Sequence, residues 1–129
     1  MAAVATWGHR NNTGAVYILR RGRDGRWSQE AKVMASDAAE GQWFGQSVAL
    51  SGDRLAVGAP QMNGNRGAVY LFRRGAGGWT EASKLTVEDA AENYAFGNAL
   101  LWVGDRLLAG AVGADNYGGK VHVYAMSDA

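Results

Sequence analysis

Short apolar runs separated by glycine-marked turns are the main pattern along this chain. In the middle of the sequence, four such runs predict strands at residues 47–50, 54–59, 67–73 and about 79–87. We name these strands a, b, c and d. The a–b, b–c and c–d connections are short and contain glycine, as antiparallel hairpins require. No segment has the spacing of an amphipathic helix, so the pattern predicts an all-β chain.

Strand c is apolar on both of its faces. Val69 and Leu71 project to one side of the strand. Tyr70 and Phe72 project to the other side, where a sheet that faced water would carry polar residues. Small four-stranded sheets that stack face to face and repeat around an axis bury both sides of each strand. The pattern is therefore typical of a β-propeller blade.

The same sequence pattern occurs more than once along the chain. The stretch "FGQSVALSGDRLAVGAP" at 44–60 returns as "FGNALLWVGDRLLAGAV" at 96–112. The segment Gly14-Ala15-Val16-Tyr17 likewise returns at 67–70, and in weaker form from Gly119, with a period of 52 to 53 residues. A sequence repeated at fixed spacing marks a structural unit that cannot bury its apolar faces alone.

In order, the repeats predict strands b-c-d, then a-b-c-d, then a-b-c. This divides the chain into a partial blade at 1–43, a full blade at 44–95 and a partial blade at 96–129. Propellers close with roughly four to eight blades, whereas about two and a half blades are expected here. We therefore expect closure by oligomerisation, with a dimer favoured, either as six blades or as five blades if strands exchange. A fragment of a longer propeller is the other possibility.

Composition restricts the classes of partner. The 129 residues are 47% hydrophobic and 19% charged, which suits one globular domain. Thirteen basic and twelve acidic side chains nearly cancel, at a net charge of +1, so no nucleic-acid partner is expected. No apolar run approaches the length that a bilayer requires, and cysteine is absent, so neither membrane insertion nor disulfides are expected. No segment of the signal-peptide type opens the chain.

The Phe-Gly of 44–45, the Gly-Ala-Pro of 58–60 and the Gly-Ala-Val-Tyr of 67–70 together resemble the FG-GAP repeat of integrin α-subunit heads and bacterial surface proteins. The resemblance implies a β-propeller and a place outside the cell or at its surface. It implies that Phe44 and Phe96 pack between neighbouring blades. It also implies that the glycine after each phenylalanine allows close backbone approach.

The sequence departs from the family at its calcium site. Many integrin-type repeats hold calcium in an Asp-rich a–b loop, but here that loop is Ser51-Gly52-Asp53 or Val103-Gly104-Asp105. One carboxylate per loop is too few for an ion that takes six to eight oxygen ligands. We expect no metal and no cofactor.

Catalytic candidates have simpler interpretations. His122 replaces a strand-c tyrosine and is expected in the core. The pairs Asp37/Glu40 and Asp89/Glu92 recur in equivalent d–a loops, where turn formation explains them better than a glycosidase dyad. No serine lies in a nucleophile elbow. Six arginines, at positions 20, 21, 23, 26, 73 and 74, are expected to form a solvated rim on the c–d hairpins.

The remaining feature is a ring of variable loops. In a propeller the b–c and d–a loops emerge on the same side, and here they combine amides with aromatic rings. Rings stack on sugar C–H faces while amides bind hydroxyls, although asparagine is also a common turn residue. Trp43 and Tyr94 accompany the tentative ligand-binding set, which is Trp7, His9, Asn11, Asn12, Gln61, Asn63, Asn65, Asn116 and Tyr117.

The sequence thus predicts a non-enzymatic module that binds carbohydrate or protein through these loops, as in adhesion. The alternative is a structural or engineered repeat unit whose main property is self-assembly into a closed propeller.

Overall fold

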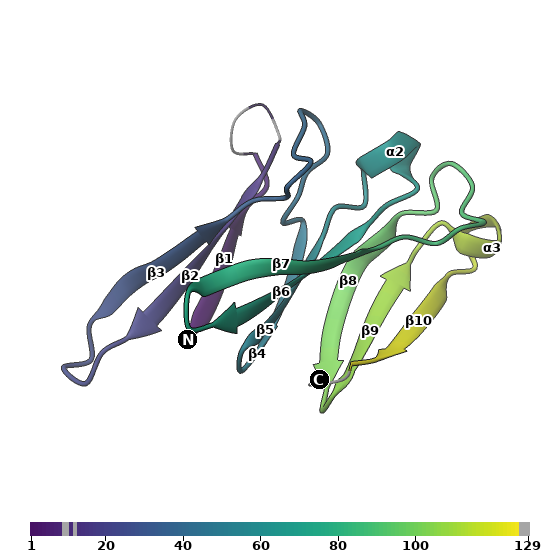
Figure 1. Cartoon of the computed structure of the whole chain (residues 1–129). Helices are drawn as coiled ribbons and strands as arrows, with labels where there is room; N and C mark the ends of the chain where they lie inside the picture. Colours follow the sequence, from purple (N-terminus) through teal and green to yellow (C-terminus); the bar gives the residue numbers. More distant parts are fainter. Residues whose placement is uncertain (9–10, 12, 127–129) are drawn as a thin grey trace.

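The computed structural model describes residues 1–8, 11 and 13–126, and this part of the chain forms ten strands in three antiparallel sheets (Figure 1). We call the sheets blades 1, 2 and 3. Blade 1 consists of β1 (Ala2–Thr6), β2 (Ala15–Arg21) and β3 (Trp27–Val33). Blade 2 consists of β4 (Ser47–Ser51), β5 (Arg54–Gly58), β6 (Val69–Gly75) and β7 (Gly78–Leu85). Blade 3 consists of β8 (Phe96–Val103), β9 (Arg106–Ala111) and β10 (Lys120–Ala125).

This strand order confirms the repeat. Within the blades the strands pair as β1-β2-β3, β4-β5-β6-β7 and β8-β9-β10, which corresponds to b-c-d, a-b-c-d and a-b-c. Among the described residues, blade 1 has no strand a and blade 3 has no strand d. The registers repeat as well, because Val4 faces Tyr17 in blade 1 just as Val57 faces Tyr70 in blade 2. The three sheets form an arc that does not close on itself.

The expectation of no helix was wrong in detail. Two single turns, α2 (Met62–Asn65) and α3 (Ala114–Tyr117), occupy the b–c loops of blades 2 and 3. In α2, Asn63 and Gly64 have φ of 55° and 66°, so the segment is closer to a tight loop than to a regular helix. Four residues are too few to show helical periodicity in a sequence, which is why the pattern did not reveal these turns.

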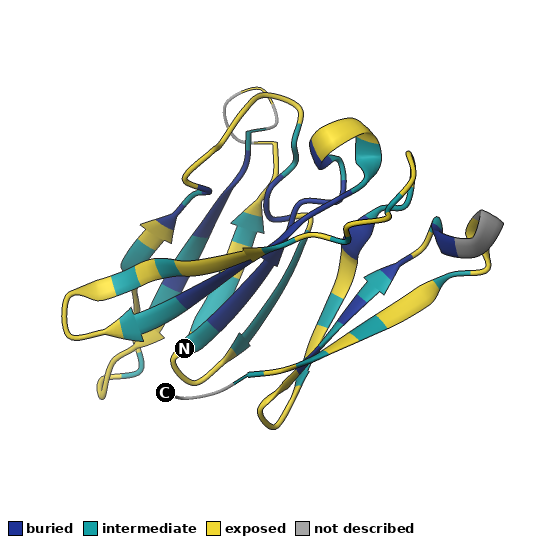
Figure 2. Cartoon of the chain, turned by 45° about the vertical axis from the view of Figure 1, so that its right-hand side comes forward, coloured by how far each residue is buried: buried dark blue, intermediate teal, exposed yellow. Residues whose placement is uncertain are grey.

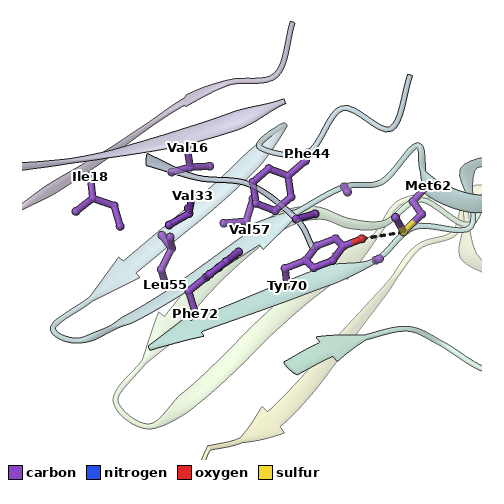
Figure 3. Packing of buried hydrophobic residues seen from close by; sticks show 12 residues of the cluster. Val16, Ile18, Val33, Phe44, Leu55, Val57, Met62, Tyr70 and Phe72 are labelled. Atoms are coloured by element: carbon purple, nitrogen blue, oxygen red, sulfur yellow. Dashed lines mark hydrogen bonds between the residues drawn. The ribbon is translucent and has the colours of Figure 1, made fainter. Parts of the chain in front are cut away.

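The core lies between the blades rather than within a single sheet. We call the contact between blades 1 and 2 the first junction and that between blades 2 and 3 the second junction. At the first junction the fully buried Phe44 ring packs edge-on against Tyr70 and Phe72, with centroids 5.4 and 6.0 Å apart. Figure 3 shows these rings with Val16 and Ile18 of blade 1. Aliphatic and aromatic side chains thus interdigitate between two stacked sheets.

Phe96 has the same place at the second junction. It is fully buried in a cluster with Ala56 and Val69 of blade 2 and Leu107 of blade 3. The two phenylalanines that the resemblance placed between blades are therefore found there.

Two glycines allow the backbones at these junctions to touch. Gly14 and Gly67 have φ of 88° and 94°, and a Cβ atom at either would overlap the carbonyl oxygen of Phe44 or Phe96, respectively. Gly119 is their equivalent in blade 3 and has a similar φ of 82°, but its Cβ would meet only the Ala111 oxygen at 3.9 Å. The close approach therefore exists only where another blade follows.

Candidate binding site

The variable loops gather at one end of the arc. Figure 1 shows the b–c loops with α2 and α3, together with the d–a loops, at the upper end, and the a–b and c–d hairpins at the opposite end. We call the upper end the loop face. The described members of the tentative ligand-binding set belong to loops on this face, but they form separate groups rather than one cluster.

The first group lies above blade 1. The Trp7 and Trp43 rings stack with centroids 4.8 Å apart and 24° between their planes. Trp7 keeps 45% of its surface exposed. Beside them, Asn11 has a φ of 58° and donates a hydrogen bond from Nδ2 to Glu40 Oε1 at 3.3 Å. His9 and Asn12, which were predicted to join this group, lie outside the described residues.

The second group lies between blades 2 and 3, where the asparagines have a structural task. Asn63 and Asn65 adopt left-handed φ values of 55° and 63°, which asparagine tolerates better than most residues. Asn65 also donates from Nδ2 to Asn93 Oδ1 at 3.2 Å, and its carbonyl accepts the Ala95 N–H at 2.8 Å. Gln61 precedes α2 and is half-buried. Asn63 leaves its side chain exposed, so it is the member of this group that is best placed to contact a ligand.

The third group surrounds a hollow of about 680 Å³ beside blade 3. Tyr117, at the end of α3, is 70% exposed and lines this hollow together with Tyr94 and His122. The Tyr94 hydroxyl lies 2.8 Å from His122 Nε2, and the histidine ring meets Phe96 edge-on at 5.3 Å. His122 is therefore half-buried against the core as expected. Asn116 belongs to α3, but its side chain is outside the described part of the structure.

A carboxylate that receives several hydrogen bonds lies on the outer rim of the first junction, and no sequence pattern indicated it. Glu30 of β3 accepts hydrogen bonds from Arg74 Nε at 2.9 Å, Arg74 Nη2 at 2.8 Å and Trp79 Nε1 at 2.7 Å. Arg20 approaches the same carboxylate at 3.5 Å. The hydrogen bonds from Arg74, followed by the one from Trp79, lower the pKa of Glu30. We call Glu30, Arg74 and Trp79 the rim clamp.

The rim clamp corrects the interpretation of the arginines as merely solvated. Arg74 of blade 2 binds the Glu30 carboxylate of blade 1 in a bidentate geometry, which arginine can form and lysine cannot. The pairing was invisible in the sequence because 44 residues separate the partners and because Ala82 stands where the next repeat would need Glu30.

Asp37 lies in the expected turn and also joins two blades. Its carboxylate accepts hydrogen bonds from the Tyr70 hydroxyl and from Lys84 Nζ, both at 2.6 Å, so the loop after blade 1 is held to blade 2. Burial disfavours ionisation of Asp37, but these two hydrogen bonds outweigh it and lower its pKa. Burial, followed by the bond to this carboxylate, raises the pKa of Tyr70.

The described residues were also considered as metal ligands and as membrane-spanning helices. No three histidine, cysteine, aspartate or glutamate side chains in that part of the chain lie close enough together to hold a metal ion. None of its helices is long and apolar enough to cross a bilayer.

Comparison with protein families gives one match. A family model described as FG-GAP repeat matches the chain twice, at residues 27–72 and 79–124, and together these segments cover well over half of it. Each match begins with the tryptophan that opens a strand d and ends within strand c of the next blade. No curated protein matches the chain.

Proposed function

Because the chain belongs to the FG-GAP repeat family, we propose that it is a binding module of the β-propeller type that recognises carbohydrate or protein through its loop face. The module is not an enzyme in this proposal, and it works outside the cell or at the cell surface, as in adhesion. The loop face is favoured because its b–c loops differ from blade to blade while the strands repeat.

The observation that carries this proposal is the Trp7–Trp43 stack. The Trp43 and Trp7 rings stack with their centroids 4.8 Å apart, and the Trp7 side chain nevertheless remains about half exposed. An exposed tryptophan whose orientation is held by a neighbour loses little entropy when it binds, which makes it a good anchor for a sugar face or a protein side chain. Asn11 belongs to the same b–c loop, where its Nδ2 bonds to Glu40 and its amide oxygen is a further hydrogen-bond acceptor on the loop face.

Replacement of Trp7 by alanine tests this proposal against an internal control. Trp27 is similarly exposed, at 53%, but it opens strand β3 at the opposite end of the arc. We expect Trp7→Ala to weaken binding to an arrayed glycan or a captured protein at least about tenfold. Trp27→Ala and Arg23→Ala should leave binding unchanged. Equal losses from both ends would rule out the loop face.

Self-assembly is the second candidate, and a specific surface favours it. Val121 and Val123 of β10 are 64% and 54% exposed. Their repeat equivalents in blade 2, Val69 and Leu71, are buried against blade 3. Blade 3 therefore turns outward a surface of the kind that blade 2 buries, and Leu101 and Val103 extend it. A second copy that packs its blade 1 on this surface continues the arc, and two copies together provide six blades.

The oligomeric state tests the second candidate. We expect light scattering to give the mass of a dimer at micromolar concentration and the melting temperature to rise with protein concentration. Leu101→Glu and Val121→Glu replace exposed side chains, so each should give a folded monomer. A monomeric mass for the unmodified chain, with a melt independent of concentration, would contradict assembly and would leave the loop-face proposal intact.

A further inference from the structure

The outer edge of blade 3 differs from the outer edges of the other two blades. β3 and β7 end blades 1 and 2 and carry glutamate and lysine, which are typical of protected edges. β10 pairs with β9 on one side, and no described strand pairs with its other side. Its Lys120–Ala125 sequence has valine at alternate positions and one charge, at its first residue. β10 thus has the composition of an interior strand, although its residues are exposed or only partly buried at the edge of the sheet (Figure 2).

At the first junction, β7, the strand d of blade 2, contacts the preceding blade through two residues. Lys84 of β7 bonds to Asp37, and Trp79 of β7 bonds to Glu30 and packs against the core. The other strand d, β3, has the same residues at the same interval, Trp27 and Lys32. Both strands therefore follow one pattern, in which a tryptophan precedes a lysine by five positions.

The second junction contains counterparts for both contacts. Asp89 is the repeat equivalent of Asp37, and it is exposed with no hydrogen bond or ion pair to the described residues. Where Trp79 packs at the first junction, the second has a hollow of about 300 Å³. Ala82 lines this hollow in place of Glu30, together with Trp102 and Met126. The second junction thus has an acidic group and a partly apolar hollow that correspond to the two contacts of strand d at the first junction.

We propose that the outer edge of β10 is an acceptor site for an extended peptide segment that carries a tryptophan followed, five positions later, by a lysine. The segment adds to β10 as a fourth antiparallel strand. Its lysine reaches Asp89, and its tryptophan fills the hollow between Ala82 and Met126. At its Asp89 end the site borders the third loop-face group, because Asp89 and His122 line the same hollow as Tyr117, but it lies on a different blade from the Trp7–Trp43 stack.

The register follows from blade 2. There Tyr70 faces Lys84 and Arg74 faces Trp79, with a bulge between Leu71 and Phe72. In blade 3 the equivalent of Tyr70 is His122 and the equivalent of Arg74 is Met126. The added lysine therefore lies opposite His122 and the added tryptophan opposite Met126. The bulge then falls opposite Val123 and Tyr124, as required for both side chains to point toward blade 2.

A peptide with the sequence of residues 78–87, GWTEASKLTV, tests the site directly. The Leu101→Glu chain should be used, so that self-assembly does not interfere. We expect saturable binding, measured by titration calorimetry up to about 1 mM peptide. In hydrogen exchange, the peptide should protect amides of β10 and leave those of β2 unchanged. A scrambled peptide should not bind.

Variants of each partner separate the two contacts. A peptide with Lys84→Glu should bind about tenfold more weakly to the chain, and one with Trp79→Ala should lose at least as much. A chain with Asp89→Lys should prefer the Lys84→Glu peptide, which reverses the order of affinities. Asp37→Lys is the matched control, because it introduces the same charge at the first junction, and it should leave the order unchanged.

A tethered form covers the case in which the free peptide is too weak to detect. GWTEASKLTV joined through a short glycine linker after the last residue should raise the melting temperature by about 5 °C, whereas a scrambled tail should not. Peptide binding without protection of the β10 amides would overturn the proposal. It would also be overturned if the Asp89→Lys chain did not reverse the order of affinities for the two peptides. The absence of both peptide binding and tail stabilisation would also overturn it. Loss of glycan binding in Trp7→Ala would be unaffected by either result.

Discussion

The first and second junctions share an inner half and differ in their outer half. Near the inner strands, each junction buries a phenylalanine, Phe44 or Phe96, and brings a glycine against its carbonyl oxygen. At the outer rim, the first junction has the rim clamp and the Asp37 contacts. The second junction has an apolar hollow there instead.

Strand d is part of the reason, although Arg74 and Tyr70, which also bond to Glu30 and Asp37, belong to strand c of blade 2. All the outer contacts made by blade 2 to blade 1 through β7 come from Trp79, Glu81 and Lys84, which bond to Glu30, Ser36 and Asp37, respectively. Among the described residues blade 3 has no strand d, and so it cannot hold blade 2 in the same way. The comparison shows that a blade of this type is joined to its predecessor by phenylalanine on the inner side and by side chains of strands c and d on the outer side.

The largest effects are expected where the two junctions are alike. Phe44→Ala and Phe96→Ala each remove a fully buried ring and should each lower the free energy of unfolding by about 3–5 kcal/mol. Denaturant titration measures both. A loss below about 1 kcal/mol for Phe96→Ala alone would show that the second junction is not packed like the first.

The glycines distinguish a junction from a free blade. Gly67→Ala places a Cβ against the Phe96 carbonyl in a left-handed conformation and should destabilise the fold by about 3 kcal/mol. Gly119→Ala has the same conformational penalty without the contact, so about 1 kcal/mol is expected. Thermal or chemical denaturation compares the two, and equal losses would contradict the proposed role of close approach.

The rim clamp should make the first junction sensitive to acid. The folded pKa of Glu30 lies below its ordinary value of 4.5, so its stabilising contribution is complete above that pH. The contribution is lost as the pH falls through the folded value. Between about pH 5 and pH 3 the melting temperature of the native chain should therefore fall more steeply than that of Glu30→Gln. If the melting temperatures of the two chains fell in parallel with pH, the rim clamp would not be the source of the acid sensitivity. An Ala82→Glu/Met126→Arg chain, which builds the glutamate–arginine pair of the clamp at the second junction, should show a steeper fall.

A smaller difference is expected for the paired aspartates. Asp37→Asn weakens bonds to Tyr70 and Lys84 and should cost about 1 kcal/mol, since Asp37 and Lys84 are themselves partly exposed. Asp89→Asn removes no such bond within the described residues and should change stability by less than about 0.5 kcal/mol. A similar loss from both substitutions, measured by thermal denaturation, would indicate that Asp89 already has a partner.

The smallest expected effect is that of calcium removal. Each a–b loop contributes one carboxylate, Asp53 or Asp105, which is too few for the ion. Addition of EDTA should leave the melting temperature unchanged in both the native chain and Gly119→Ala. A fall of several degrees that calcium restores would contradict our interpretation of these loops.

Much of the architecture was predictable because it depends on repetition and alternation. The repeat located the strands of all three blades, and a strand c that is apolar on both sides indicated stacked sheets. The candidate site was predicted less well. Asn63 and Asn65 lie in the predicted loops, but their left-handed backbone and the Asn65–Asn93 bond show that they also build those loops. Residue type alone does not separate a turn former from a ligand.

The sequence by itself determined the strand order, because the strand pattern recurs from blade to blade, and its resemblance to the FG-GAP repeat placed Phe44 and Phe96 at the junctions. Only the tertiary structure decided that Glu30 meets Arg74 and Trp79, that Asp37 joins two blades and that Trp7 rests on Trp43. These partners come from different blades or from distant loops. Their interaction depends on the distance and angle at which the sheets stack, and that geometry is a property of the packed side chains as a whole, with no local signature in the chain.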